Sequence, residues 1–212
     1  MRTRPLYFGA LIGLWTTTII AYLWFIDTRY FDLFNEWTRQ NIITFYVFLL
    51  ISKILAIVWP PLPGSLFTLG SIPFIGWPAA LAVEIVGGLT GASITYYLGK
   101  WYGYPFLKRI FSEDIVAKIK QIKIRKDREI ESIFVARVAG AGNLMEIVCY
   151  GAGVLNVRFS RFLIASFMAN LLALPIFYIG GNVLKGGNIL LGLAFGAVTL
   201  FIFWKIKGRY VE

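Results

Sequence analysis

Long runs of apolar residues, separated by short polar segments, follow one another along the chain. Several of them approach the ~20 residues that a helix needs to cross a bilayer. The runs cover residues 6–26, 42–59, 77–99, 132–157, 159–184 and 188–206, and a polar stretch at 100–131 interrupts the series. This pattern predicts an all-α polytopic membrane protein.

The first run follows Arg2 and Arg4, as the hydrophobic part of a signal peptide would. It has no small-x-small cleavage site before Asp27, and it ends in the bulky residues Trp24 and Phe25. We therefore expect a retained transmembrane helix at 6–26.

The apolar segment "VWPPLPGSLFTLGS", residues 58–71, contains three prolines and two glycines where an unbroken helix would be expected. Proline lacks an N–H and glycine a side chain, so both end helices. The runs on either side are too close together for a polar loop to reach water between them. We therefore expect a re-entrant hairpin, which enters the membrane, breaks and leaves on the same side. The alternative is a kinked helix held by packing.

The distribution of lysine and arginine tests this membrane topology, because loops rich in these residues stay in the cytoplasm. With the N-terminus inside, the stretch 100–131 and the C-terminal tail also lie inside. The basic residues left outside are then Arg29, Arg39 and Lys185. We expect four transmembrane helices, two hairpins that enter from opposite sides, and both termini in the cytoplasm.

The two halves of the chain resemble each other. Gly64 and Ser65 correspond to Gly142 and Asn143, and "TYYLGK" corresponds to "IFYIGG". Since one hairpin enters from each side, this is an inverted repeat, the arrangement from which many transporters build a site at the membrane midplane. Ser65 and Asn143 are good N-cap residues, and the half-helices that they begin would point free N–H groups at an anion.

Composition excludes several functions. Hydrophobic residues make up 58% of the 212 residues, and the mean hydropathy is +0.71. The chain has no histidine and one cysteine, Cys149, which removes the commonest metal ligand, the usual general base and any internal disulfide. We expect neither an enzyme nor a metal or cofactor site. The net charge of +10 indicates membrane topology rather than nucleic-acid binding.

Four ionisable residues lie inside apolar runs: Lys53, Glu84, Arg137 and Glu146. A charge at the bilayer centre costs roughly 2.5–3.5 kcal/mol on insertion scales, so these side chains should face the interior. One hypothesis is two structural ion pairs. The other is a polar cavity in which Arg137, with Lys53, binds an anionic head group while Glu84 or Glu146 exchanges a proton. Glu84 shares a helical face with three glycines that allow close approach: Gly87, Gly88 and Gly91.

A smaller feature lies in the polar stretch, where Ile115, Ile119 and Ile122 form a narrow apolar stripe on a basic helix. Such a helix either lies on the anionic inner leaflet or connects the two halves in water.

The ordered motifs "PPLPGSLFTLGS", "GGLTGASITYYLGKWYG", "FVAR", "MEIVCYGAGVLNVRFSRF" and "LPIFYIGG" together resemble a known family. This is the DedA family, also called the SNARE-associated or VTT-domain family, and the resemblance is strongest to its Tvp38-like branch. It covers residues 42–184. It implies two opposed re-entrant hairpins and lipid flipping or scrambling, namely recycling of undecaprenyl phosphate in bacteria and phospholipid scrambling in eukaryotic relatives.

The resemblance also implies roles for particular residues. Arg137 falls on the family's arginine, Gly64 on its Pro-Gly break, and Glu146 on an acidic position of the Tvp38-like branch. Where many members have a carboxylate after Pro-Gly, this chain has Ser65. Lys53 stands about where another membrane-embedded acid is expected.

These observations divide the chain into an N-terminal helix with an outer loop (1–41), a family-like core (42–184) and a C-terminal helix with a basic tail (185–212). We expect a lipid transporter, a flippase or scramblase, that moves an anionic lipid such as a phospholipid or polyprenyl phosphate. The alternatives are an ion- or proton-coupled transporter of a small solute and a non-transporting scaffold. The expected substrate-binding residues are Arg137, Lys53, Ser65, Asn143, Gly64 and Gly142.

The expected partners are membrane lipids with anionic head groups, not nucleic acid, and assembly as a homo-oligomer is left open. In a prokaryote the protein would lie in the plasma (inner) membrane.

Overall fold

The computed structural model describes residues 28–59, 64–111, 113–121, 128–139 and 145–183. Within these ranges every element is an α-helix and no strand occurs, as the apolar pattern predicts. The chain divides into two compact units, Met1–Phe45 and Tyr46–Glu212, each described by itself below. The helices predicted at 6–26 and 188–206 lie outside the described residues, and so does the count of four spans that depends on them.

Two stretches of the described chain are long and apolar enough to cross a membrane, Trp77–Ile110 and Phe159–Asn182. A third candidate combines Arg29–Gln40 with Ile42–Val58, which are bent by 101° at the break between them. These helices agree with the membrane protein that the composition predicts.

The first unit contains α2 (Arg29–Gln40), in a segment that the apolar pattern predicts to be an outer loop. Its C-cap is Asn41, whose side-chain amide donates a hydrogen bond of 3.0 Å to the carbonyl of Trp37. Polar and apolar residues alternate along α2 at helical spacing, so a search for continuous apolar runs misses it.

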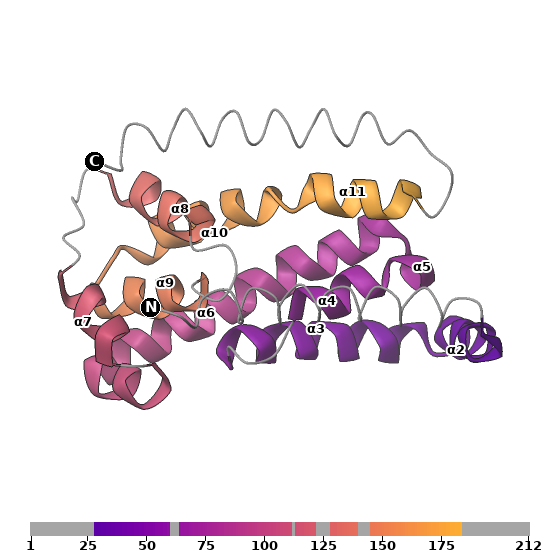
Figure 1. The fold of residues 1–212 in the computed structure, drawn as a ribbon, viewed down its shortest axis with the longest axis horizontal. Coiled ribbons are helices and arrows are strands. Elements are labelled where there is room, and N and C mark those ends of the chain that lie inside the picture. Colours follow the sequence, from indigo (N-terminus) through magenta and orange to yellow (C-terminus); the bar gives the residue numbers. More distant parts are fainter. Residues whose placement is uncertain (1–27, 60–63, 112, 122–127, 140–144, 184–212) are drawn as a thin grey trace, which may run out of the picture. The chain divides into compact units, whose positions relative to one another are not determined.

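The first half of the core contains α3 (Ile42–Val58), α4 (Gly64–Gly70), α5 (Ile72–Ile75) and α6 (Trp77–Ile110) (Figure 1). The helices end and begin on either side of the predicted break. The start of α4 packs back on α3, because a Cβ atom at Gly64 would lie 2.5 Å from that of Ala56.

α3 and α6 run in the same direction. A Cβ atom at Gly87 would lie 2.7 Å from Cγ of Lys53, and one turn further along both helices a Cβ atom at Gly91 would lie 2.9 Å from that of Ile57. The glycines of α6 therefore permit the close approach that their shared face predicts.

α6 continues past Gly99, where its apolar run ends, as far as Ile110. It kinks at Gly103, which has a φ of 62° and a ψ of −154°, a conformation that residues with a side chain rarely adopt. The polar residues of this last part lie at exposed positions, so hydropathy alone places the end of the helix too early.

The second half contains α8 (Glu129–Ala139), α9 (Met145–Val154), α10 (Phe159–Leu171) and α11 (Leu174–Val183). α9 crosses α6 with the two backbones in contact. A Cβ atom at Gly99 would collide with the carbonyl of Tyr150, and one at Gly153 would collide with the carbonyl of Tyr96. α8 and α10 are joined at Glu129, whose Oε2 accepts a hydrogen bond of 3.2 Å from the backbone N–H of Arg158.

The helix α7 (Glu113–Gln121) turns its apolar side toward the protein. Val116 and Ile119 are buried in a cluster with Leu107 and Tyr150. Of the two interpretations of the isoleucine stripe, the structure therefore favours a connector packed on the core over a membrane-surface helix. Ile122 lies outside the described residues.

Candidate functional site

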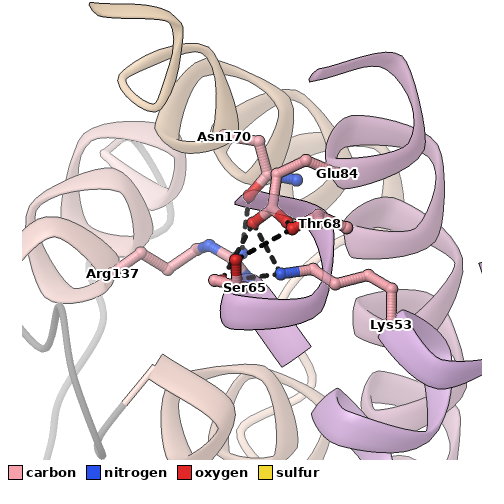
Figure 2. A network of polar contacts seen from close by, with 6 residues as sticks. All are labelled: Lys53, Ser65, Thr68, Glu84, Arg137 and Asn170. Atoms are coloured by element: carbon pink, nitrogen blue, oxygen red, sulfur yellow. Dashed lines mark hydrogen bonds and ion pairs between the residues drawn. The ribbon is translucent and has the colours of Figure 1, made fainter. Parts of the chain in front are cut away.

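One polar cluster lies where α3, α4 and α6 meet (Figure 2). Nζ of Lys53 forms an ion pair of 2.5 Å with Oε1 of Glu84 and donates a hydrogen bond of 2.9 Å to Oγ of Ser65. Ser65 in turn donates to the same carboxylate oxygen at 3.1 Å. Thr68 donates to the other oxygen, Oε2, at 2.6 Å. Both ends of this ion pair are therefore held by additional hydrogen bonds, as a charge pair inside a membrane protein requires.

The position of Ser65 differs from the prediction that it caps the half-helix. α4 begins at Gly64, so Ser65 lies inside its first turn. Its hydroxyl group bonds Lys53 and Glu84 instead of the N–H groups of its own helix. Ser65 is exposed and Glu84 half-buried, so this cluster reaches the protein surface.

A second cluster surrounds Arg137, which is only 2% exposed. Its Nη1 contacts Sγ of Cys149 at 2.7 Å, and its Nη2 donates a hydrogen bond of 3.2 Å to Oδ1 of Asn170. In the described part of the chain no carboxylate lies within ion-pair distance of this guanidinium group. Arg137 is thus a buried cation whose described partners are neutral.

Several buried polar atoms, on Arg137 and on the helices α9 and α10 that contact it, have no hydrogen-bond partner among the described residues. They are Nε of Arg137 itself, Nδ2 of Asn170, Oγ of Ser166 and Oε2 of Glu146. Three of these groups are hydrogen-bond donors, and a buried donor without an acceptor costs about 1–3 kcal/mol. An arrangement of this kind is able to accept an anion.

The two clusters adjoin through α6 and α9. Lys53 packs on Gly87, while Nδ2 of Asn170 would lie 2.7 Å from a Cβ atom at Gly88. Glu146 is close enough to Lys53 and Arg137 to interact electrostatically with both. Figure 2 shows Lys53 and Arg137 extending toward the same place from different helices.

A further contact connects α9 with the end of α3. The hydroxyl group of Tyr150 in α9 donates a hydrogen bond of 2.8 Å to the carbonyl of Val58, the last residue of α3. Tyr150 thereby satisfies a carbonyl group that the end of a helix leaves unpaired.

The structure brings together most of the residues that the sequence singled out. Lys53, Gly64, Ser65 and Glu84 share the first cluster, and Arg137 and Glu146 belong to the second. Gly142 and Asn143 lie outside the described residues. Of the two ion pairs in the structural hypothesis, the described residues contain one, Lys53 with Glu84.

Four polar residues in or near the clusters are not among the predicted site residues: Thr68, Cys149, Asn170 and Ser166, which lies one turn before Asn170. Outside the two predicted breaks, the prediction rests on ionisable side chains. Thr68 follows Ser65 by one turn, and Asn170 is an amide in an apolar run, so both carried a signal in the sequence.

An open groove of about 380 Å³ adjoins the first cluster. The groove is lined by Tyr46, Val47, Leu50, Ala79, Ala82, Val83 and Val86. Leu50 at one end also packs on Gly87, with its Cδ1 3.5 Å from where a Cβ atom would lie. An apolar groove therefore ends beside the polar cluster.

Comparison with known proteins identifies the region that holds both clusters, apart from Lys53. The sequence profile of the VTT domain matches residues 62–183 of the 212-residue chain. Over 116 residues the chain is 25% identical to an uncharacterized protein of Methanocaldococcus jannaschii, MJ0201, and the alignment covers 54% of this chain and 70% of that relative. No solved structure matches the chain.

Proposed function

Because the chain belongs to the VTT-domain (DedA) family of membrane proteins, which is commonly linked to lipid transport, we propose that it moves an anionic lipid across the bilayer as a flippase or scramblase. The proposed ligand is the phosphate of a phospholipid or of a polyprenyl phosphate. The observation that carries this proposal is the environment of Arg137.

A buried guanidinium group without a carboxylate at ion-pair distance has its charge only partly compensated, and such groups persist in proteins where another anion or a function uses them. Arg137 offers the planar donor geometry that suits paired phosphate oxygens. Its Nε, together with Nδ2 of Asn170 and Oγ of Ser166, provides donors that have no partner in the described part of the chain. An anionic head group would supply the negative charge and the acceptor oxygens that this cluster lacks.

The groove between α3 and α6 supports an amphiphilic ligand over a small solute. A lipid needs a polar site for its head group and an apolar surface for its chains, and the groove ends beside Lys53 and Glu84. Its volume of about 380 Å³ is within the range of ligand sites in proteins.

The first hairpin is supported by the directions of its helices. If α3 and α6 were successive crossings, they would be antiparallel. They run parallel, with Lys53 against Gly87 and Ile57 against Gly91, so α4 and α5 return the chain to the side where α3 began. Re-entrant hairpins have this geometry.

The second half repeats this arrangement. Ser65 lies 12 residues after Lys53 and contacts it, and Cys149 lies 12 residues after Arg137 and contacts it. Glu84, the next partner of Lys53, follows it by 31 residues, and Asn170, the next partner of Arg137, follows it by 33. This correspondence supports a structural repeat with a cation at the equivalent place in each half.

The direction of the second half supports an inverted repeat. Gly88 of α6 lies against Asn170, whereas Tyr96, further along α6, stacks on Phe162, which precedes Asn170, with ring centroids 5.0 Å apart. α6 and α10 are thus antiparallel. Inverted repeats with broken helices are typical of transporters that work by alternating access.

The two acids have different roles in this proposal. Glu84 holds Lys53 in place through the ion pair and two hydroxyl groups. Glu146 has a carboxylate oxygen without a described partner and lies near both cations, so it is the acid that we propose for proton exchange.

The proposal is tested by reconstituting the full chain in liposomes that contain fluorescent phosphatidylglycerol. The assay measures how fast labelled lipid in the inner leaflet becomes accessible to a membrane-impermeant reductant outside the liposomes. Fluorescent glucosylceramide, which has a polar but uncharged head group, is the matched control. We expect the protein to accelerate the movement of phosphatidylglycerol and to leave that of glucosylceramide at the rate of protein-free liposomes. Equal acceleration of both lipids, or of neither, contradicts the anionic site.

A further inference from the structure

The helix α2 (Arg29–Gln40) of the first unit has three distinct faces. Its least exposed residues are Phe31, Asn35 and Thr38, which follow one another at helical spacing, and Thr38 is fully buried at 0% exposure. This face is the buried side of the helix.

A second face of α2 is apolar and exposed. It consists of four large side chains with exposed fractions of 69%, 52%, 37% and 44%, respectively: Tyr30, Leu33, Phe34 and Trp37. At 100° per residue they fill a sector roughly 100° wide, beside the packed face and separate from it. The rest of the circumference is polar and is formed by Arg29, Asp32, Glu36, Arg39 and Gln40.

We propose that α2 is an interfacial helix that lies in the plane of the bilayer surface, with this apolar face among the lipid head groups and upper acyl chains. Tyrosine and tryptophan are enriched at that depth because their rings are apolar and their polar atoms remain hydrated. An interfacial helix has a polar face toward water and an apolar face buried about 5–10 Å into the bilayer, which matches the sectors of α2.

The chain geometry at Asn41 gives independent support. α3 is an apolar helix, and α2 is bent by 101° from it. If α3 enters the membrane near the bilayer normal, α2 lies close to the membrane plane. The exposed apolar surface also continues past the bend, because Ile42 and Ile43 at the start of α3 are 37% and 76% exposed.

The charges of α2 indicate which lipids it contacts. Arg29 and Arg39 are balanced by Asp32 and Glu36, so the helix carries no net charge from these side chains. Binding then depends on apolar burial rather than on attraction to anionic lipids, and it does not require the lipid transport proposed above.

The test uses the full chain with one added cysteine at a time, labelled with an environment-sensitive fluorophore and reconstituted in phosphatidylcholine vesicles. Tyr30→Cys and Trp37→Cys report on the apolar face, and Asp32→Cys and Glu36→Cys are their matched controls on the polar face. The parent protein, whose Cys149 is buried, controls for background labelling. Lipids with a nitroxide quencher near the head group or deep in the acyl chain report depth. Thermal unfolding verifies each variant, and Leu33→Cys replaces an apolar-face variant that fails to fold.

We expect the shallow quencher to act equally at Tyr30 and Trp37, and about threefold more strongly there than at the polar face. A helix that crosses the membrane would instead place these two positions ~10 Å apart in depth, since they are seven residues apart at 1.5 Å per residue. Weak quenching on both faces would mean that protein, such as a second copy of the chain, covers the apolar side. Either of these two results overturns the proposal.

Discussion

Arg137 is buried and charged, and its hydrogen-bond partners among the described residues are neutral. The proposed function depends on this combination. Its partners Cys149 and Asn170 satisfy part of the guanidinium group without compensating its charge. Lys53 is also buried, at 6% exposure, but it has Glu84 as a partner. The two cations are therefore expected to respond differently to substitution.

Asn170→Asp places a carboxylate at the position where Nη2 of Arg137 already finds an acceptor. We expect the free energy of unfolding to rise by about 1–2 kcal/mol, because a charged hydrogen bond replaces a neutral one. Lipid transport should fall, because the new carboxylate occupies the site of the anion. Thermal unfolding in detergent and the liposome assay measure the two effects. Asn156→Asp at an exposed position is the control and should change neither quantity.

An Asn170→Asp protein that is no more stable and transports lipid at the parent rate would show that Arg137 does not need an anion.

At this scale the sequence identifies the charged residues but not their pairing. Apolar runs show that Lys53, Glu84, Arg137 and Glu146 are unusual, because a charge in hydrocarbon is costly. They do not show which of them meet, since pairing depends on how α3, α6, α8 and α10 pack. Asn170 was missed because an uncharged amide is a weaker signal than a charge.

At the scale of the helices, the crossing of α6 and α9 is held by two glycines that face the backbone of the other helix. A Cβ atom at Gly99 or Gly153 would collide with a carbonyl group, which cannot move as a flexible side chain can. This crossing brings α9, with Glu146 and Cys149, to the side of α6.

Gly99→Ala should therefore force α6 and α9 apart and lower the free energy of unfolding by about 1–3 kcal/mol, the cost typical of overpacking. Gly70→Ala is the matched control, because a Cβ atom there has nothing within 4 Å. We expect the control to stay within about 0.5 kcal/mol of the parent protein. Thermal unfolding in detergent compares the two variants, and equal stability of both contradicts the close crossing.

The sequence predicts helices well where it contains strong local signals. Prolines and glycines place the first break, and the described helices end at Val58 and begin again at Gly64. The sequence does not predict the presence of α2 or the full length of α6. Polar residues on the exposed faces of these helices give the segments a composition like that of a loop. Only packing distinguishes an exposed helical face from a loop.

At the scale of the whole molecule, the family and the helical membrane architecture were predictable from ordered motifs and apolar runs, and the match of the VTT domain to residues 62–183 confirms the family. The inverted repeat stays a proposal, supported by parallel helices within each half and antiparallel helices between them. The Tvp38-like branch and the orientation of both termini stay predictions. Orientation depends on how the lysines and arginines lie relative to the two membrane surfaces, which the fold of the chain alone does not fix.

The central claim is that Arg137 binds the anionic head group during transport, and the most direct measurement is the rate at which reconstituted Arg137 variants move fluorescent phosphatidylglycerol. Among the described residues Arg137 has no carboxylate within ion-pair distance, so Arg137→Ala breaks no described ion pair and should still fold and insert. We expect Arg137→Ala to move lipid no faster than protein-free liposomes. Arg137→Lys should lose most of the activity, because an ammonium group keeps the charge without the paired donors. A folded Arg137→Ala protein that moves phosphatidylglycerol at the parent rate would contradict the account.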